Sequence, residues 1–207
     1  GLRGVGGDGG RGALAYHGNF VETILNIEAG YLGVERFPEL IFHGQGASDV
    51  QHARETGRTA IFFGFQNPSP IEDDIGLVEV LHKLGGRFMQ LSYNNQSLLA
   101  TGCYEAEGTG ITRMDKQVIR EMNRVGMVID MSHSGEQSTL HALELSERPI
   151  DITHANPTFF ADALRNKSDT GFQPIGRSAG LLGFNTYQYH LKNRPTRRPQ
   201  AIWAMSS

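Results

Sequence analysis

Short apolar runs alternate with amphipathic stretches from Thr59 onward. Strands are predicted at residues 59–65, 87–92, 127–131, 149–153 and 181–186. Helical spacing of the apolar residues predicts helices at 71–84, 113–124 and 136–146, and a broken helix between 158 and 177. Apolar strands that alternate with helices are typical of a parallel sheet with helices packed outside it. The pattern therefore predicts an α/β fold.

Capping residues sharpen several of these boundaries. Thr112 is a typical N-cap for the helix at 113–124, and Gly126 stands where a left-handed C-cap would fall. Before the first predicted strand, residues 20–29 show helical spacing. The segment Ser-Asp-Val-Gln at 48–51 resembles a capping box that opens a helix through about Arg58.

Polar residues at the ends of the strands favour one α/β architecture over another. Each predicted strand is followed by polar side chains, among them Gln66, Tyr93, His133, His154 and Tyr187. A barrel gathers such side chains from many strand ends onto one rim. We therefore expect a (β/α)8 TIM-barrel type, incomplete because about five strands are visible. An open doubly wound sheet stays as the alternative.

The two ends of the chain differ in composition from the middle. Residues 1–17 are rich in glycine and are predicted to have no structure, whereas residues 18–191 form the partial barrel domain. Residues 192–207 form a basic, proline-containing tail, for which a solvated segment is the expectation. An incomplete barrel would leave the strands at 59–65 and 181–186 with open edges, so association into a homodimer is expected.

Composition excludes several classes of partner. The net charge of −3 gives no basic footprint for nucleic acid, and no apolar run approaches the length of a membrane span. The single cysteine, Cys103, cannot form an internal disulfide, and this suggests the reducing cytoplasm. Neither the P-loop nor the dinucleotide-binding pattern occurs, and no G-x-S-x-G elbow surrounds the serines near His133.

Two histidines carry the strongest chemical signal. His133 and His154 each follow an apolar run and precede a predicted helix, so both belong at the carboxyl ends of neighbouring parallel strands. Strands about 4.8 Å apart would let both imidazoles reach one Zn²⁺. The alternative is that they are ordinary loop or helix-capping histidines.

Further donors and contacts are open to two interpretations each. Gln66 could offer an amide oxygen to a metal or could be a polar residue that bonds to backbone. Asp130 could orient an imidazole from outside the ligand shell or could be a buried structural aspartate. Arg165 could clamp a substrate carboxylate or could be an exposed arginine at a helix end.

At this point the sequence resembles a known family. The segments Asp130-Met-Ser-His133-Ser, Ile152-Thr-His154-Ala-Asn and Leu164-Arg165-Asn166-Lys-Ser-Asp169 look like those of the membrane (renal) dipeptidases, which are zinc peptidases. The resemblance covers approximately residues 18–191.

The resemblance implies a (β/α)8 barrel with two zinc ions, in which a metal-activated hydroxide attacks the peptide bond of a dipeptide. It implies that His133 and His154 hold one zinc and that Arg165 binds the substrate carboxylate. Tyr187 looks like a residue that lines the same pocket. A dipeptide or similar small carboxylate is the expected substrate.

The sequence also departs from the family. Gln66 stands where the family has a metal-bridging Glu, and Tyr93 stands where it has a substrate-binding His. The resemblance implies that the other zinc is held by an N-terminal H-x-D and a late Asp. Here no histidine is followed two residues later by Asp, and no Asp or Glu occurs after Asp169. One zinc or none is therefore expected here. The hypotheses are a truncated zinc dipeptidase of impaired activity, a catalytically inactive barrel-type binding protein that retains the carboxylate pocket, or a mononuclear hydrolase of different substrate range.

Overall fold

A computed structural model describes residues 3–5, 20–106, 108–187 and 190–191 of the chain. The strands are β1 (Arg3–Val5), β2 (Ile41–His43), β3 (Thr59–Phe65), β4 (Gly86–Gln90) and β5 (Val128–Asp130). The helices are α1 (Phe20–Arg36), α2 (Ala47–Thr56), α3 (Gly76–Lys83), α4 (Arg113–Val125), α5 (Glu136–Leu145) and α6 (Asp169–Arg177), with a 3₁₀ turn at Ser69–Ile71.

These strands form one parallel sheet. β3 pairs with β1, β2 and β4, and β4 pairs with β5. Parallel bridges from Asp130 to Asp151 and from Ile152 to Leu182 continue the sheet beyond β5. The α/β prediction is confirmed.

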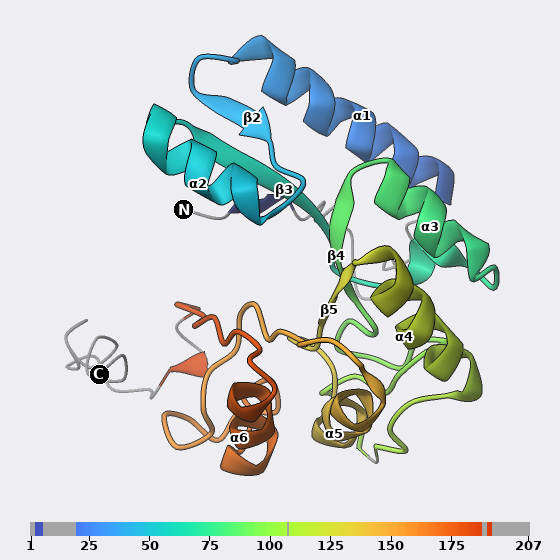
Figure 1. The fold of residues 1–207 in the computed structure, drawn as a ribbon. Coiled ribbons are helices and arrows are strands. Elements are labelled where there is room, and N and C mark those ends of the chain that lie inside the picture. The colour runs from blue at the N-terminus through green and yellow to red at the C-terminus, as the bar shows by residue number, and fades with distance from the viewer. Residues whose placement is uncertain (1–2, 6–19, 107, 188–189, 192–207) are drawn as a thin grey trace.

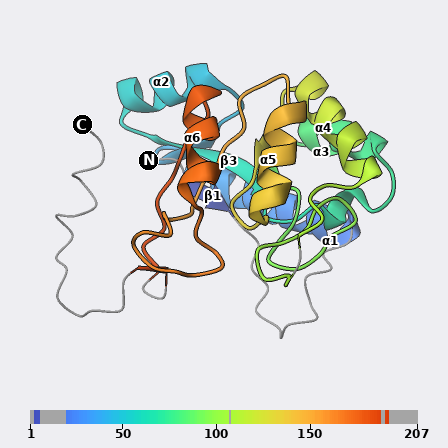
Figure 2. The same ribbon diagram turned by 90° about the horizontal axis from the view of Figure 1, so that it is seen from below.

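The order of the strands favours a barrel-type arrangement. From β3 to the bridge at Leu182, neighbours in the sheet follow one another in the sequence. Right-handed crossovers then place successive helices on the same side of the sheet, whereas a doubly wound sheet needs a reversal of strand order. Helices α3, α4, α5 and α6 do lie side by side in this order in both views (Figures 1 and 2).

Three of the five predicted strands are observed as strands, and two are reduced to isolated bridges. β3 has the predicted bounds, and β4 and β5 are shorter than predicted. In the last two segments, side chains replace backbone partners: Leu181 N donates to Asp151 Oδ1 and Asn185 N donates to Asn156 Oδ1. These contacts interrupt the regular ladder.

The amino-terminal predictions need correction. Residues 1–17 were expected to have no structure, but Arg3–Val5 forms β1 and pairs with Ile61, Phe62 and Phe63 of β3. The open edge expected at 59–65 is therefore wrong, since β3 is paired with three strands. The remaining residues of 1–17 and the tail at 192–207 lie outside the described residues.

Three helices begin elsewhere than predicted. The helix expected at 71–84 starts only at Gly76, since Ser69–Ile71 forms a 3₁₀ turn and Glu72 has a positive φ of 50°. α2 starts at Ala47 and not after Ser48, because Asp49 Oδ2 accepts hydrogen bonds from the backbone of Gln45 (2.7 Å) and Gly46 (3.0 Å). The expected helix at 158–177 is confined to α6, which Ser168 caps by accepting a hydrogen bond from Gly171 N. The predicted caps of α4, Thr112 and a left-handed Gly126, are confirmed.

The core lies between the sheet and its helices. Four consecutive residues of β3, Ala60 to Phe63, are buried, as expected of a strand covered on both faces. The most deeply buried apolar side chains include Val78, Leu81, Met89, Val118, Ile119, Met122, Ile129 and Ile152. Most come from α3, α4 and the middle strands, so the strand ends in this part of the sheet rest on a buried apolar core.

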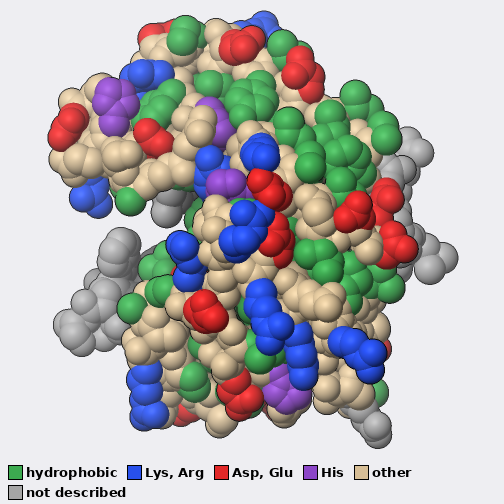
Figure 3. All heavy atoms as spheres, turned by 45° about the vertical axis from the view of Figure 1, so that its right-hand side comes forward, with side chains coloured by type: hydrophobic (Ala, Val, Ile, Leu, Met, Phe, Trp, Pro, Cys, Tyr) green, Lys and Arg blue, Asp and Glu red, His purple; other side chains and the backbone are tan. Residues whose placement is uncertain are grey.

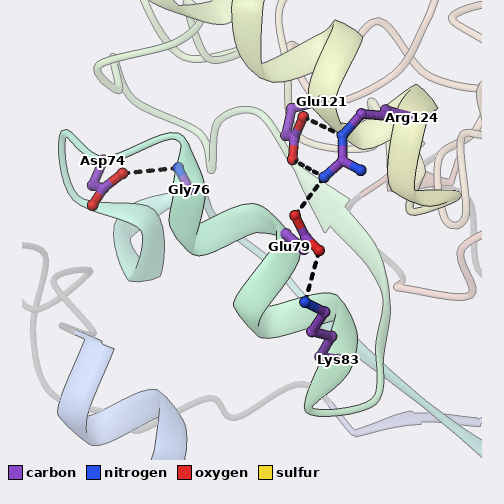
Figure 4. Close-up of polar contacts among 6 residues, drawn as sticks. All are labelled: Asp74, Gly76, Glu79, Lys83, Glu121 and Arg124. Carbon is purple, nitrogen blue, oxygen red and sulfur yellow. Dashed lines mark hydrogen bonds and ion pairs between the residues drawn. The ribbon is translucent and has the colours of Figure 1, made fainter.

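A small polar network links α3 to α4 on the surface (Figure 4). Arg124 of α4 contacts Glu121 and Glu79, and Glu79 of α3 also pairs with Lys83. At the start of α3, Asp74 Oδ1 accepts a hydrogen bond from Gly76 N at 2.8 Å. These exposed contacts join the two helices at the surface and contribute little to stability.

Two features of the described residues concern membrane-spanning helices and the distribution of surface charge. No helix among the described residues is long and apolar enough to cross a membrane. On the face shown in Figure 3, acidic and basic side chains are intermixed. This distribution agrees with the net charge of −3.

Candidate metal centre

The two histidines meet at the carboxyl end of the sheet. His133 lies three residues after β5, and His154 follows the bridged segment at Asp151 and Ile152. Their Nε2 atoms are 2.9 Å apart, and the ring centroids are 5.0 Å apart with an interplanar angle of 62°. The prediction that neighbouring strand ends bring the two imidazoles together is confirmed.

A hydroxyl and a carboxylate hold His154. Its Nδ1 lies 2.7 Å from Thr153 Oγ1, which lies 2.6 Å from Asp130 Oδ2. A proton must lie between the hydroxyl and carboxylate oxygens, so Thr153 donates to Asp130. The Thr153 oxygen is then an acceptor for an Nδ1–H of His154, and Nε2 of His154 carries a lone pair directed at His133.

Asp130 is the hub of this arrangement. It is 4% exposed and accepts five hydrogen bonds. The donors are Gln90 Nε2 (2.9 Å), Ser132 N (2.9 Å) and Oγ (2.5 Å), and Thr153 N (3.1 Å) and Oγ1 (2.6 Å). Both interpretations of Asp130 hold at once: it is a buried structural residue, and it reaches an imidazole through Thr153.

His133 is held on its other side by an amide and a guanidinium. Its Nδ1 lies 2.7 Å from Asn94 Oδ1 and 3.2 Å from Arg165 Nε. These two neighbours make opposite demands, since the oxygen calls for an Nδ1–H and the guanidinium for a lone pair. We assign the proton to Nδ1 because the contact to Asn94 is the shorter. Tyr93 stacks on the His133 ring at 4.0 Å and 19°.

Burial keeps both imidazoles neutral. Desolvation lowers the pKa of His133 far below its ordinary value, and the nearby Arg165 guanidinium and His154 lower it further. Desolvation also lowers the pKa of His154, which Asp130 partly opposes. Neutral imidazole is the form that binds metal ions.

The paired nitrogens fit a metal ion in chemistry and nearly in distance. With protons on both Nδ1 atoms, two Nε2 lone pairs face each other, which is favourable only with a cation between them. Two nitrogens bound to one tetrahedral Zn²⁺ at 2.0–2.1 Å would be about 3.3–3.4 Å apart. The rings need to separate by only a few tenths of an ångström. No cluster of three or more His, Cys, Asp or Glu suited to a metal occurs in the part of the chain that the structure describes.

Arg165 lies inside the protein beside the histidines, so the alternative of an exposed helix-end arginine is wrong. Its side chain is 1% exposed, and Nη2 donates to the His154 carbonyl at 2.7 Å. Nη1 is buried and has no hydrogen-bond partner among the described residues. A buried guanidinium with a free donor can bind a carboxylate.

Lys167 adds a second buried cation near Arg165. It is 2% exposed, and its Nζ donates to the Ser134 carbonyl, which joins the His154 loop to the His133 turn. Burial, and secondly the positive charge of Arg165, lowers the pKa of Lys167 to about 8. Two buried basic side chains therefore lie beside the histidines.

The structure does not bring every predicted residue to the histidines. Gln66 follows β3, at the same end of the sheet as the histidines but two strands from β5, which corresponds to about 10 Å. Tyr187 is 53% exposed, and its ring packs edge-on against His190 at 5.0 Å. A metal contact of Gln66 and a substrate contact of Tyr187 stay predictions.

Several residues around the site were given no role from the sequence. Thr153, Asn94, Lys167 and Ser132 each contact a histidine, Asp130 or the loops that carry them. Threonine and serine are common at strand ends, so the presence of Thr153 and Ser132 there does not predict a role at the site. Asn94 has a positive φ of 63°, a backbone conformation that asparagine tolerates, but this is visible only in the structure.

Comparison with known proteins identifies relatives over most of the chain. A family profile described as "Membrane dipeptidase (Peptidase family M19)" matches residues 17–202. The dipeptidase verJ of Clonostachys rogersoniana is 25% identical over 162 residues, which are 77% of this chain and 42% of that protein. The dipeptidase tcpJ of Claviceps purpurea is 22% identical over 169 residues, 81% of this chain and 40% of that protein.

Solved structures agree with the fold. An amidohydrolase from Pseudomonas aeruginosa is 35% identical with a TM-score of 0.77, over 80% of this chain and 51% of that one. A metallo peptidase from Rhodobacter sphaeroides, liganded with a phosphinate mimic of the dipeptide L-Ala-D-Ala, is 22% identical with a TM-score of 0.72, over 77% of this chain and 48% of that one. The chain thus spans about two fifths to one half of the length of these relatives.

Proposed function

Because the chain belongs to the membrane dipeptidase family, we propose that it carries part of the active site of a zinc-dependent hydrolase that cleaves dipeptides. The observation that carries the proposal is the 2.9 Å contact between the Nε2 atoms of His133 and His154, each ring being held by its Nδ1. In this account the two histidines hold one Zn²⁺.

The surrounding residues have separate roles in the proposal. Arg165 binds the carboxylate of the substrate through the buried Nη1, which has no partner among the described residues. Tyr93 covers one face of the His133 ring and excludes water from it. Lys167 fixes the two loops that carry the histidines by its bond to the Ser134 carbonyl.

The chemistry divides between the metal and the chain. When bound, zinc supplies Lewis acidity and lowers the pKa of a water molecule. The residues of this chain orient the substrate: Arg165 holds the carboxylate end close to the histidine pair. Gln66 stays a candidate for a further oxygen ligand, and Tyr187 for the pocket wall.

Zinc content tests the proposal. We expect the purified 207-residue chain to bind about one zinc ion after loading, because the two histidines make a single ligand set whose remaining positions water can fill. His133→Ala and His154→Ala each remove one of the two ligands and should abolish most of this binding. Metal content by mass spectrometry of the protein solution measures the effect.

His52→Ala is the matched control, because His52 is exposed on α2. It should bind as much zinc as the unchanged chain. If both His133→Ala and His154→Ala bound as much zinc as the unchanged chain, the ligand assignment would be contradicted.

A second function has one observation in its favour. Gln66 is an amide at the end of β3, and an amide cannot bridge metals as a carboxylate does. A catalytically inactive binding protein would keep the carboxylate-binding site around Arg165 and lose the reaction. Zinc-loaded chain that binds dipeptides without hydrolysing them would favour it, whereas metal-dependent hydrolysis of N-acyl amino acids but not dipeptides would favour the hydrolase of different range.

Compartment and association are proposals too. The single Cys103 is buried and forms no disulfide, which is compatible with the cytoplasm that we propose. Residues 181–183 pair with the segment at 151–155 on one side. We propose that the other edge of residues 181–183 pairs with a second copy of the chain. β3 does not support the proposed homodimer, because it is already paired with three strands.

A further inference from the structure

Thr153 stands between a buried carboxylate and one of the two site imidazoles. We propose that Thr153 is a positioning residue. It donates its hydroxyl proton to Asp130 and accepts a hydrogen bond from Nδ1 of His154, and this pair of bonds fixes the tautomer of His154. The inference rests on the proposed function for its purpose, a metal ligand at Nε2, but the contacts themselves do not depend on a metal.

The direction of the hydrogen bonds follows from the distances. Asp130 Oδ2 and Thr153 Oγ1 are 2.6 Å apart, which two oxygens reach only when a proton lies between them. The carboxylate has four other donors, so its lone pairs are already engaged and it acts only as an acceptor. Thr153 Oγ1 also lies 3.0 Å from Ser132 Oγ, but the Ser132 proton is donated to Asp130 Oδ1 at 2.5 Å. The single Thr153 hydroxyl proton is therefore committed to Asp130.

This commitment leaves the Thr153 oxygen as an acceptor. His154 Nδ1 lies 2.7 Å from that oxygen, so the imidazole must supply the proton. A neutral imidazole with a proton on Nδ1 has its lone pair on Nε2, the atom that faces His133 at 2.9 Å. Orienting groups outside the ligand shell commonly act on metal-bound histidines in this way.

The backbone is held independently of the hydroxyl. Thr153 N donates to Asp130 Oδ1 at 3.1 Å, and His154 N donates to Ser132 Oγ at 3.1 Å. Replacing Thr153 by the isosteric valine keeps these two bonds and removes only the hydroxyl. The variant therefore separates orientation of the imidazole from the path of the chain.

The test compares Thr153→Val, Thr153→Ser and a control, Thr56→Val, whose hydroxyl bonds among the described residues to the His52 carbonyl on α2. In the zinc-free full chain, ¹⁵N NMR of the imidazole nitrogens reports which nitrogen carries the proton. We expect Nδ1–H at His154 in the unchanged chain, in the serine variant and in the control, and loss of this preference in the valine variant. Zinc affinity should fall about 10- to 100-fold in the valine variant alone.

The outcomes separate the two proposals. A valine variant that keeps the Nδ1–H form and the zinc affinity of the unchanged chain would overturn the positioning role. If no variant binds zinc but the tautomer shifts as expected, the positioning role stands and the metal function fails. If Thr153→Val unfolds, Asp130→Asn breaks the same relay at its other end, and retention of the Nδ1–H form there would overturn the inference.

Discussion

At the scale of single residues, the site depends on side chains whose protons are assigned by their neighbours. Asn94 holds the Nδ1 proton of His133, and Asp130, through Thr153, holds the Nδ1 proton of His154, so the Nε2 lone pairs of the two rings face each other. Arg165 and Lys167 bring positive charge into the same buried region. Buried charge of one sign with free donors is costly unless a ligand supplies the opposite sign, so these residues favour an anionic substrate.

A second buried carboxyl group, that of Asp115, makes the stability of the chain depend on pH. Asp115 lies in the first turn of α4, is fully buried, and has no hydrogen-bond partner at either carboxyl oxygen among the described residues. Burial raises its pKa from 3.8 to about 8. The folded chain therefore retains a proton that the unfolded chain releases above about pH 4.

This proton makes stability fall with rising pH. Between about pH 4 and pH 8 the folded state binds more protons at Asp115, so the free energy of unfolding declines by up to about 1.4 kcal/mol per pH unit from this group. Asp115→Asn should remove that decline. Urea denaturation midpoints at pH 5 and pH 7.5 measure it, with the exposed Asp73→Asn as control. Parallel pH profiles for the unchanged chain and Asp115→Asn would refute the assignment.

At the scale of elements, the sequence predicted what local pattern determines. The uninterrupted apolar run at 59–65 predicted β3 with its observed bounds, and the caps Thr112 and Gly126 predicted the ends of α4. β1 and β2 were missed because three-residue strands depend on pairing with β3 and not on their own composition. The relay through Thr153 was missed because it depends on the register between two segments.

The last two strand segments are close enough to require glycine. A Cβ at Gly183 would lie 1.9 Å from the Thr153 carbonyl oxygen. Gly183→Ala should therefore lower the free energy of unfolding by about 1–3 kcal/mol, because the segment that contains Gly183 must move away from the backbone of Thr153. Urea denaturation measures the loss.

Gly33→Ala provides the comparison, since a Cβ there would contact nothing within 4 Å and the residue lies in α1. Alanine in a helix interior should raise the free energy of unfolding by about 0.5–1 kcal/mol. Equal stability of the two variants would show that the strand segments are not packed as described.

At the scale of the whole molecule, the parallel sheet acts as a platform that carries polar groups at one end. Strand order follows the sequence from β3 to Leu182, and the helices α3 to α6 cover one side (Figures 1 and 2). The chain spans about half of the solved relatives, so the ligands that the resemblance places in an H-x-D and a late Asp are not among its described residues. His133 and His154 are therefore the part of the metal site that this chain can be tested for.

The most direct test is the position of a zinc ion in crystals of the chain. An anomalous difference map recorded at the zinc absorption edge should show a peak between His133 and His154, about 2.0–2.1 Å from each Nε2. The Nε2 atoms should then lie farther apart than the 2.9 Å described here. A zinc peak at another place, or no peak while the two rings keep their direct contact, would contradict the account.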